Sequence, residues 1–319
     1  MNRTFSDEAI AALESRLPST LPPSAVRQPV HTVYGGANLF KAETPEKFGT
    51  LALRALEQFA SDAASFQVTE DVYARVLHKL RTAPVEDYRI DFEDGYGHRP
   101  DDEEDGHAVS AANEVARAAR EGKLPAGIGI RVKPLTGQLY RRSIRTLDIF
   151  LNRLCEQVEL PAGFLVTLPK ITSEQQVSIL AGLLDELEAK LAVAPGSIGI
   201  ELMIETPRAL FNEAGECALP LLAAAGRGRT VAAHLGAYDY TALCDVIASF
   251  QLLTSPICDY VRHTMQAALA GTGLRLVDGA TNVMPVAIHR GKELSADQAA
   301  ENRDAVHRAW ALHRGHVRR

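Results

Sequence analysis

The feature that most constrains the fold is the segment 198–205, in which apolar residues alternate with glycine, methionine and two glutamates. On a β-strand, the isoleucines and the leucine would share one face, while Glu201 and Glu205 would share the other. Burying an unpaired carboxylate is costly, so each glutamate must be paired, bound to a metal or neutralised. The segment therefore predicts a strand with one packing face and one face toward a polar interior.

The same division between an apolar and a polar face recurs in three other segments, 88–94, 128–133 and 231–236. Strands of an open doubly wound sheet would be apolar on both faces. A barrel whose outer face meets helices and whose inner face lines a polar site accounts better for the alternation. The polar members of the three segments are Arg89, Asp91, Glu93, Arg131, Lys133 and His234.

Strand-like runs alternate with helical stretches, which favours parallel pairing and an α/β fold. Helices are expected to begin at Thr44 and Pro45 and at Pro256. Another begins with a capping box made by Ser173 and Gln176. We therefore predict a (β/α)₈ TIM barrel, although the gap between the last two strands leaves no room for a helix. The strand candidates are 30–34, 88–92, 128–133, 164–169, 198–204, 231–236, 274–277 and 283–288.

Residues 1–29 are expected to form an N-terminal helical extension outside a barrel domain of residues 30–319. Its helix, over residues 6–17, has Ser6 as its cap and apolar residues at helical spacing. Appended helices of this kind often cover a barrel end or a neighbouring subunit. We therefore expect a homo-oligomer.

The composition limits the classes of protein to which this chain can belong. With 319 residues, of which 46% are hydrophobic, the chain can bury a large core. Its net charge of −6 gives no reason to expect nucleic-acid binding. No apolar run approaches the length of a membrane span, and the start lacks a secretion-signal pattern. The four cysteines are widely spaced and lack metal-ligand pairing, which favours a reduced, cytoplasmic setting.

Polar residues follow the carboxyl ends of the expected strands, where barrels carry their active sites. Carboxylates without clustered histidine or cysteine suit a hard cation such as Mg²⁺ or Mn²⁺. Glu205 and Asp239, on consecutive strand ends, fit the one or two carboxylates that Mg²⁺ usually takes from a protein. Arg131 would face the same centre and is suited to bind a carboxylate or a developing enolate. The other polar strand ends are Glu93, Asp94, Lys133 and Lys170.

Six motifs, in order, resemble the citrate lyase β-subunit and 2-oxo-acid aldolase family of the phosphoenolpyruvate/pyruvate barrel superfamily. The likeness covers about residues 30–290. RIDFEDGYGHR resembles an acidic strand end, GIRVKP an arginine strand, and VTLPKITSEQQV a proline-lysine strand with its helix. IELMIETPRAL and HLGAYDYT resemble the two metal-binding strand ends, and YVRHTMQAALAGTGLRLVDG resembles the late helix and strand.

The resemblance implies a Mg²⁺-dependent barrel that cleaves or forms a carbon–carbon bond next to a 2-oxo or thioester carbonyl. The segments HTVYGGANLF, DDEEDGH and NVMPVAIHRGKEL differ from the family pattern, so the exact substrate and any use of coenzyme A stay open. The implied site residues are Glu205 and Asp239 as metal ligands, Arg131 as the substrate arginine, and Asp91, Glu93 and Asp94 beside the metal and substrate.

The expected function is a Mg²⁺-dependent carbon–carbon lyase or aldolase acting on a 2-oxo acid or a related acyl substrate. Rival activities are a malate-synthase-like condensation, a thioesterase and a phosphotransfer reaction of pyruvate. A non-catalytic barrel that binds a metabolite is the rival outside enzymes. The general base is expected to be His31, His234 or a metal-bound water. Lys170 is either catalytic or a structural ion pair, and Glu201 is expected to pair with an inward arginine or lysine.

Overall fold

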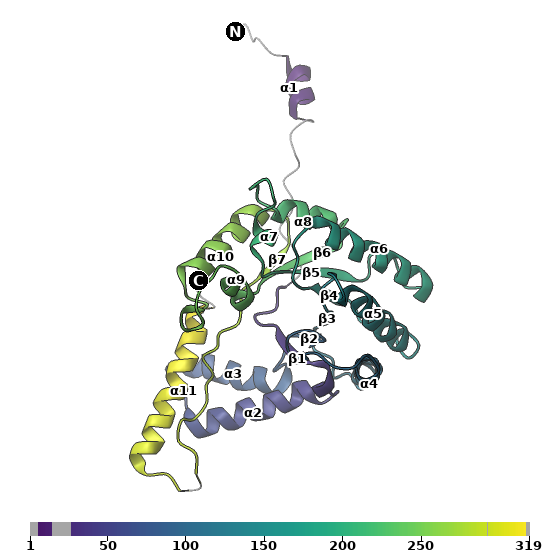
Figure 1. The fold of residues 1–319 in the computed structure, drawn as a ribbon. Helices are drawn as coiled ribbons and strands as arrows, with labels where there is room; N and C mark the ends of the chain where they lie inside the picture. The colour runs from purple at the N-terminus through teal and green to yellow at the C-terminus, as the bar shows by residue number, and fades with distance from the viewer. Residues whose placement is uncertain (1–5, 15–26, 292, 317–319) are drawn as a thin grey trace.

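Seven parallel strands form one sheet in the computed structural model, which describes residues 6–14, 27–291 and 293–316. The strands pair in chain order, each with the next, and curve around an interior (Figure 1). They are β1 (Val33–Gly36), β2 (Asp87–Asp91), β3 (Gly127–Arg131), β4 (Leu165–Leu168), β5 (Gly199–Ile204), β6 (Thr230–Leu235) and β7 (Arg275–Val277).

Helices connect most successive strands, as the α/β pattern predicts. The expected starts at Thr44 and at Pro256 are confirmed, and Ser173 and Gln176 form the capping box. The helices are α1 (Asp7–Glu14), η1 (Ala37–Leu39), α2 (Thr44–Phe59), α3 (Glu70–Thr82), α4 (Asp101–Arg120), α5 (Leu139–Cys155), α6 (Glu174–Leu191), α7 (Pro207–Leu210), α8 (Leu219–Ala225), α9 (Ala237–Leu243), η2 (Ala248–Phe250), α10 (Pro256–Leu269) and α11 (Ala296–His316). The helix predicted over 6–17 is described only as far as Glu14.

The hydrophobic core lies between the outer face of the sheet and helices α4, α5, α6 and α8, which arc around it in Figure 1. Ile90, Ile130, Val166 and Ile200 come from four neighbouring strands, and each is fully buried. Burying a side chain of this size stabilises a fold by about 1.5–3 kcal/mol. Ile90, Ile130 and Ile200 are residues that the alternation assigns to the packing face, so the expected orientation of their three strands is confirmed.

A buried ion pair lies on the opposite, inner face of the sheet. Arg89 of β2 donates from Nε and Nη2 to the two carboxylate oxygens of Glu201 of β5, at 3.2 Å each. Tyr34 of β1 and Thr167 of β4 donate their hydroxyl hydrogens to Glu201 Oε1 at 2.6 and 2.7 Å. Asp87 contacts the remaining nitrogen of Arg89. Glu201 therefore has the arginine partner that its burial demands.

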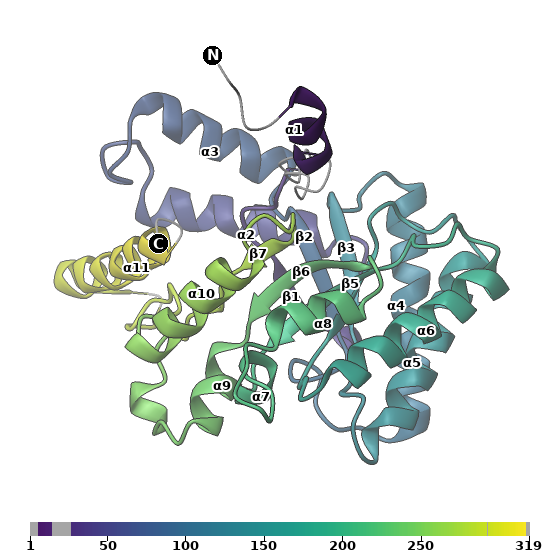
Figure 2. The ribbon, with the colours of Figure 1, turned by 90° about the horizontal axis from the view of Figure 1, so that it is seen from above.

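The predicted eighth strand is wrong, and with it the closed barrel. Residues 283–288 form no strand, and the described residues show no pairing between β1 and β7. A parallel strand needs a crossover of a dozen or more residues, which the segment 278–282 cannot supply. Val283, Met284 and Ile288 are accordingly exposed rather than packed in a sheet. The fold is a curled, barrel-like sheet that stays open on one side (Figure 2).

The last helix packs away from the sheet. α11 lies against α2, and α2 lies beside α3 in both ribbon views (Figures 1 and 2). Trp310 of α11 contacts Phe66 edge to face, with ring centroids 5.6 Å apart, in a second small apolar cluster. None of the described helices is both long enough and apolar enough to cross a bilayer.

The Arg89–Glu201 pair predicts a large effect of Glu201→Gln on stability. We expect a loss of about 3 kcal/mol, the lower end for a broken buried pair, because Asp87 still contacts Arg89. Urea and thermal unfolding measure it. The control is Glu156→Gln, which removes an exposed partner of Arg153 and should change the unfolding midpoint little. A Glu201→Gln variant as stable as the wild type would contradict the structural role.

The Arg89–Glu201 pair also determines how the stability difference between wild type and Glu201→Gln depends on pH. Burial alone would raise the pKa of Glu201, but the charge of Arg89 and the two hydroxyl donors lower it to about 2. A carboxylate whose pKa is lower in the folded than in the unfolded state stabilises the fold at pH values above its unfolded pKa, about 4.3 for glutamate. This contribution is lost as the pH falls toward the folded-state pKa. The difference in unfolding free energy between wild type and Glu201→Gln should therefore narrow from pH 5 to pH 2.

Candidate functional site

Three carboxylates from separate strand ends converge at the carboxyl edge of the sheet. Asp94 follows β2, Glu205 follows β5 directly, and Asp239 lies in the first turn of α9 after β6. One oxygen of each lies within 4.8 Å of the other two, a spacing at which all three can reach one metal ion. Glu205 is buried, Asp94 is exposed, and Asp239 is half-buried. Sequence reasoning expected Glu205 and Asp239 to meet here, and the structure adds Asp94.

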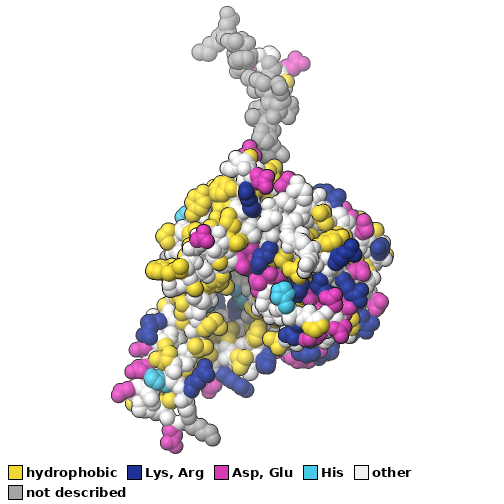
Figure 3. Space-filling view, in the orientation of Figure 1, with side chains coloured by type: hydrophobic (Ala, Val, Ile, Leu, Met, Phe, Trp, Pro, Cys, Tyr) yellow, Lys and Arg dark blue, Asp and Glu magenta, His cyan; other side chains and the backbone are white. Residues whose placement is uncertain are grey.

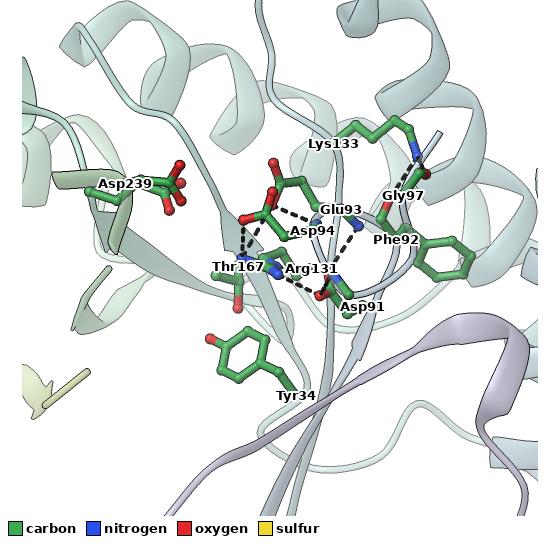
Figure 4. Close-up of polar contacts among 12 residues, drawn as sticks. Tyr34, Asp91, Phe92, Glu93, Asp94, Gly97, Arg131, Lys133, Thr167 and Asp239 are labelled. Carbon is green, nitrogen blue, oxygen red and sulfur yellow. Dashed lines mark hydrogen bonds and ion pairs between the residues drawn. The ribbon is translucent and has the colours of Figure 1, made fainter. Parts of the chain in front are cut away.

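The carboxyl edge of the sheet lies at a hollow that opens toward the viewer in Figure 3. Figure 3 shows Asp, Glu, Lys and Arg side chains gathered around that hollow. In Figure 4, Asp239 lies across from Glu93 and Asp94, with Arg131 beside them and Tyr34 farther inside. The arrangement places an acidic rim above a polar interior.

Lys170 supplies the positive charge at the centre of this group. Its Nζ lies 3.0 Å from Asp239, 3.1 Å from Asp94, 3.2 Å from Glu93 and 3.4 Å from Glu205. Its backbone N–H also donates to Glu205 Oε1 at 2.6 Å. The backbone is left-handed, with φ of 51°, a conformation that costs of order 1–3 kcal/mol in a non-glycine residue. The fold therefore holds a cation between these carboxylates at the expense of local strain.

The acidic crowding shifts the pKa values of the site. Burial raises the pKa of Glu205 to about 8; Lys170 opposes this rise, and the charges of Asp239 and Glu93 add to it. Burial, followed by the hydrogen bond with Asp94, raises the pKa of Glu93 to about 7. Burial alone would lower the pKa of Lys170, but Glu205 and Glu93 raise it instead. The site holds more carboxylate than its ammonium group balances, which favours an additional cation.

The donor set fits a hard divalent cation. All three converging ligands are carboxylates, and oxygen ligands are those that Mg²⁺ and Mn²⁺ prefer. The ammonium of Lys170 already occupies the space between the acidic oxygens, so the position is one where the protein stabilises positive charge. Asp94, Glu205 and Asp239 are the residues that would hold the metal.

Arg131 lies beside this group but is largely engaged. Its Nε donates to Asp91 Oδ1 at 2.7 Å, and a second nitrogen contacts the other oxygen of Asp91. Asp91 also accepts the backbone N–H groups of Glu93 and Gly95, at 2.9 and 2.8 Å. Asp91 therefore anchors Arg131 and the loop that carries Glu93 and Asp94, a role that sequence reasoning missed. The remaining nitrogen of Arg131, Nη1, lies 3.2 Å from Glu93 and 3.5 Å from Asp94.

Lys133 anchors the same loop from outside the site. Its Nζ donates to the carbonyl of Phe92 at 2.6 Å and pairs with the buried carboxylate of Glu104 at 2.7 Å (Figure 4). The alternation with Arg131 suggested a side chain facing the interior. Since β3 ends at Arg131, the strand alternation does not extend to Lys133, and its side chain reaches α4 instead.

The two candidate histidines lie at different depths. His31 precedes β1, at the amino edge of the sheet, where its neighbours include Lys79 and Glu86. This edge is opposite to the one that carries Glu205, so the structure does not bring His31 to the converging carboxylates. His234 lies on β6, is almost fully buried, and pairs in register with Met203. It therefore sits one inward position below the carboxylates.

Two glycines make room for the site's carboxylates. A Cβ at Gly236 would lie 2.4 Å from Cβ of Glu205, and one at Gly95 would lie 2.6 Å from Oδ2 of Asp91. No side chain fits at either distance, so both positions require glycine for the present placement of these carboxylates. The glycine in HLGAYDYT is thus explained by packing against Glu205.

A family model described as domain of unknown function (DUF6986) matches residues 8–319. The chain belongs to this DUF6986 family. No curated protein matches the sequence of this DUF6986 member.

Solved structures that match this chain include a malate synthase and a citrate synthase. Haloferax volcanii malate synthase in a magnesium and glyoxylate complex is 17% identical, with 69% of this chain and 60% of that chain covered and a TM-score of 0.47. Its lead(II) complex is 16% identical, with 70% and 63% covered and a TM-score of 0.47. Citrate synthase SbnG is 12% identical, with 78% and 76% covered and a TM-score of 0.42. The DUF6986 chain spans about 60% of the length of the malate synthase.

The converging carboxylates predict the effect of neutral substitutions on metal affinity. Glu205→Gln and Asp239→Asn should each weaken Mg²⁺ binding at least roughly tenfold, since even indirect partners of a metal are worth about 10–100-fold. Calorimetric titration measures the affinity, and circular dichroism checks the fold. The matched control is Asp297→Asn, which alters an exposed aspartate in the first turn of α11. Unchanged affinity in both site variants would refute the metal site.

The position of Lys170 predicts the opposite effect for Lys170→Met. Two unit charges about 4 Å apart near a protein surface interact by about 4 kcal/mol, and the double charge of Mg²⁺ makes its repulsion by the ammonium larger still. Removing the ammonium should therefore raise Mg²⁺ affinity, by about tenfold or more in the same titration. Lower affinity in Lys170→Met would show that Lys170 supports the site rather than competing for it.

Proposed function

We propose that this protein is a Mg²⁺-dependent enzyme that forms or cleaves a carbon–carbon bond next to the carbonyl of a 2-oxo acid. The observation that carries the proposal is the convergence of Asp94, Glu205 and Asp239 around a cationic centre at the carboxyl edge of the sheet. Active sites of barrel-like α/β folds lie at this edge. A structural ion pair would need one carboxylate for Lys170, whereas Lys170 has four.

The proposed metal ligands are Asp94, Glu205 and Asp239. A bound Mg²⁺ supplies Lewis-acid polarisation of a carbonyl and a template for a chelating carboxylate. The chain's own contribution is to bring three carboxylates from strand ends far apart in the sequence to one point. Gly236 lets the backbone approach Glu205, and the N–H of Lys170 orients one of its oxygens.

Arg131 is the proposed partner for negative charge on the substrate. Asp91 holds the guanidinium by two contacts and leaves Nη1 directed toward the site. A fixed guanidinium stabilises charge that develops during the reaction without having to reorganise. Glu93 now faces Nη1, and a substrate carboxylate or enolate oxygen would compete with Glu93 for that nitrogen. Lys170, displaced from the carboxylates, would remain close enough to bind a second anionic group.

His234 is the proposed proton acceptor, since His31 lies at the opposite edge. Its ring is buried on the inner face of β6, which lowers its pKa by desolvation. A neutral imidazole near physiological pH can take a proton from carbon next to a carbonyl. The same groups would serve a condensation with an acyl thioester, because an enolate is the nucleophile in that direction as well. A thioesterase would need an activated water in place of the enolate.

Exchange of pyruvate methyl protons in deuterated water tests the proposal. We expect Mg²⁺-dependent exchange, followed by proton NMR, that falls at least roughly 100-fold in Glu205→Gln, since preorganised electrostatic groups contribute on that scale. Arg131→Lys should also slow exchange, because lysine lacks the bidentate fork that Asp91 holds. Asp297→Asn should exchange at the wild-type rate.

The same assay separates an enzyme from a binding protein. A non-catalytic barrel would bind pyruvate together with Mg²⁺ in calorimetry and show no exchange above the metal-only rate. That result, repeated with oxaloacetate, would overturn the lyase proposal while leaving the metal site intact.

A further inference from the structure

A buried tyrosine joins the inner carboxylate to the inner histidine. Tyr34 of β1 donates its hydroxyl hydrogen to Glu201 Oε1 at 2.6 Å. The same hydroxyl lies 3.2 Å from Nδ1 of His234 on β6. The two rings meet edge to face with centroids 5.3 Å apart, and the guanidinium of Arg131 lies 5.2 Å from the centre of the tyrosine ring. Tyr34 therefore lies directly below the proposed substrate arginine and against the proposed base.

The geometry determines which atom carries each hydrogen. Arg89 pairs with Glu201 on the other side, so Glu201 is ionised and can only accept. Tyr34 has a single hydroxyl hydrogen, and it donates this hydrogen to the carboxylate 2.6 Å away. The lone pairs of the tyrosine oxygen then face His234, which must present a hydrogen at Nδ1. The other tautomer would place two lone pairs against each other at 3.2 Å.

This orientation leaves Nε2 of His234 as the unprotonated nitrogen. No described residue forms a hydrogen bond with Nε2. Nε2 is also not fully shut off from solvent. His234 precedes Gly236, which packs against Glu205, by two residues. Two residues of strand rise by about 6.6 Å. The backbone of His234 thus lies about that far below the glycine that packs against Glu205.

We propose that Tyr34 is a positioning residue that holds His234 as the Nδ1–H tautomer, so that Nε2 accepts a proton from the substrate. In that step the C–H bond next to the carbonyl breaks, its electron pair stays on the substrate as an enolate, and the proton bonds to Nε2. The positive charge gained by the imidazole lies one hydroxyl away from Glu201. The assignment of the tautomer stands alone, and the proton transfer rests on the proposed function.

Nitrogen-15 NMR of the full-length protein tests the tautomer without any substitution. Long-range ¹H–¹⁵N correlations distinguish a protonated from an unprotonated ring nitrogen. At neutral pH we expect His234 to carry its proton on Nδ1 alone. A proton on Nε2, with or without one on Nδ1, would overturn the proposal.

Three variants test the cause of the tautomer. Tyr34→Phe removes the acceptor of the Nδ1 hydrogen, so a proton should appear on Nε2 of His234. Thr167→Val removes another donor to Glu201 but leaves Tyr34 in place, so His234 should keep its wild-type signature. Tyr96→Phe breaks a second tyrosine–histidine contact, 2.8 Å from His107 Nδ1, and should alter His107 only. An unchanged His234 in Tyr34→Phe would remove Tyr34 from its assigned role.

The kinetic consequence is measured by proton exchange. Tyr34→Phe should lower the exchange rate at saturating pyruvate by about tenfold or more while leaving Mg²⁺ affinity unchanged, since general bases contribute roughly 10²–10⁴-fold. Tyr73→Phe is the control, because its buried hydroxyl binds Ala60 O in the α2–α3 cluster, far from the sheet interior. Wild-type exchange in Tyr34→Phe would overturn the positioning role. Absence of exchange in the wild type would overturn the proposed function and leave the NMR result standing.

Discussion

The buried pairing of Arg89 with Glu201 is the interaction on which the curled sheet depends. It links β2 to β5 through the interior, and Tyr34 and Thr167 bring β1 and β4 to the same carboxylate. Taking two charges out of water is expensive, and the cost is offset only when every polar atom is satisfied. Both oxygens of Glu201 are satisfied here, by three different side chains. The sheet must therefore curve enough to bring four strands around one carboxylate.

Charge balance changes along the interior from this pair to the lip. At the bottom, Arg89 is matched by Glu201 and Asp87, and in the middle Arg131 is matched chiefly by Asp91. At the lip, Lys170 meets four carboxylates, of which Asp94 is exposed and Asp239 is half-buried. The excess of negative charge is thus confined to the end that water and ligands can reach. The unmatched negative charge at the lip favours a bound cation, whereas the matched charges deeper in the interior need none.

The sequence predicted the features that follow from the alternation of residues along strands, and it missed those that depend on the path of the loops. All seven strands were located, four of them because inward polar residues and outward aliphatic residues alternate along them. The convergence of Glu205 and Asp239 followed from parallel strands ending at one edge. Asp94 was assigned to the substrate, although its oxygen lies within 4.8 Å of both other carboxylates, because the loop after β2 bends back through the contacts that Asp91 makes. Strand periodicity does not encode such a bend.

Two differences between expectation and structure also have physical causes. Residues 283–288 have the alternating apolar pattern of a strand, but the segment before them is too short to return the chain to the start of the sheet. His31 was considered because the first predicted strand, 30–34, contains it, and a sequence does not reveal the exact residue at which a strand begins. β1 begins at Val33, which puts His31 at the amino edge.

The open side of the sheet gives the inner polar residues a second task. A closed barrel would be held all round by backbone hydrogen bonds, whereas β7 has only three residues, all partly exposed, and no pairing with β1 in the described part of the chain. The contact of Tyr34 with His234 spans this side, from β1 to β6, by side chains alone. An apolar pair at these positions would also pack, but it would specify neither the distance between the two edges nor the direction of a proton. The polar contact does both, so the curvature of the sheet and the tautomer of His234 are set by the same hydrogen bonds.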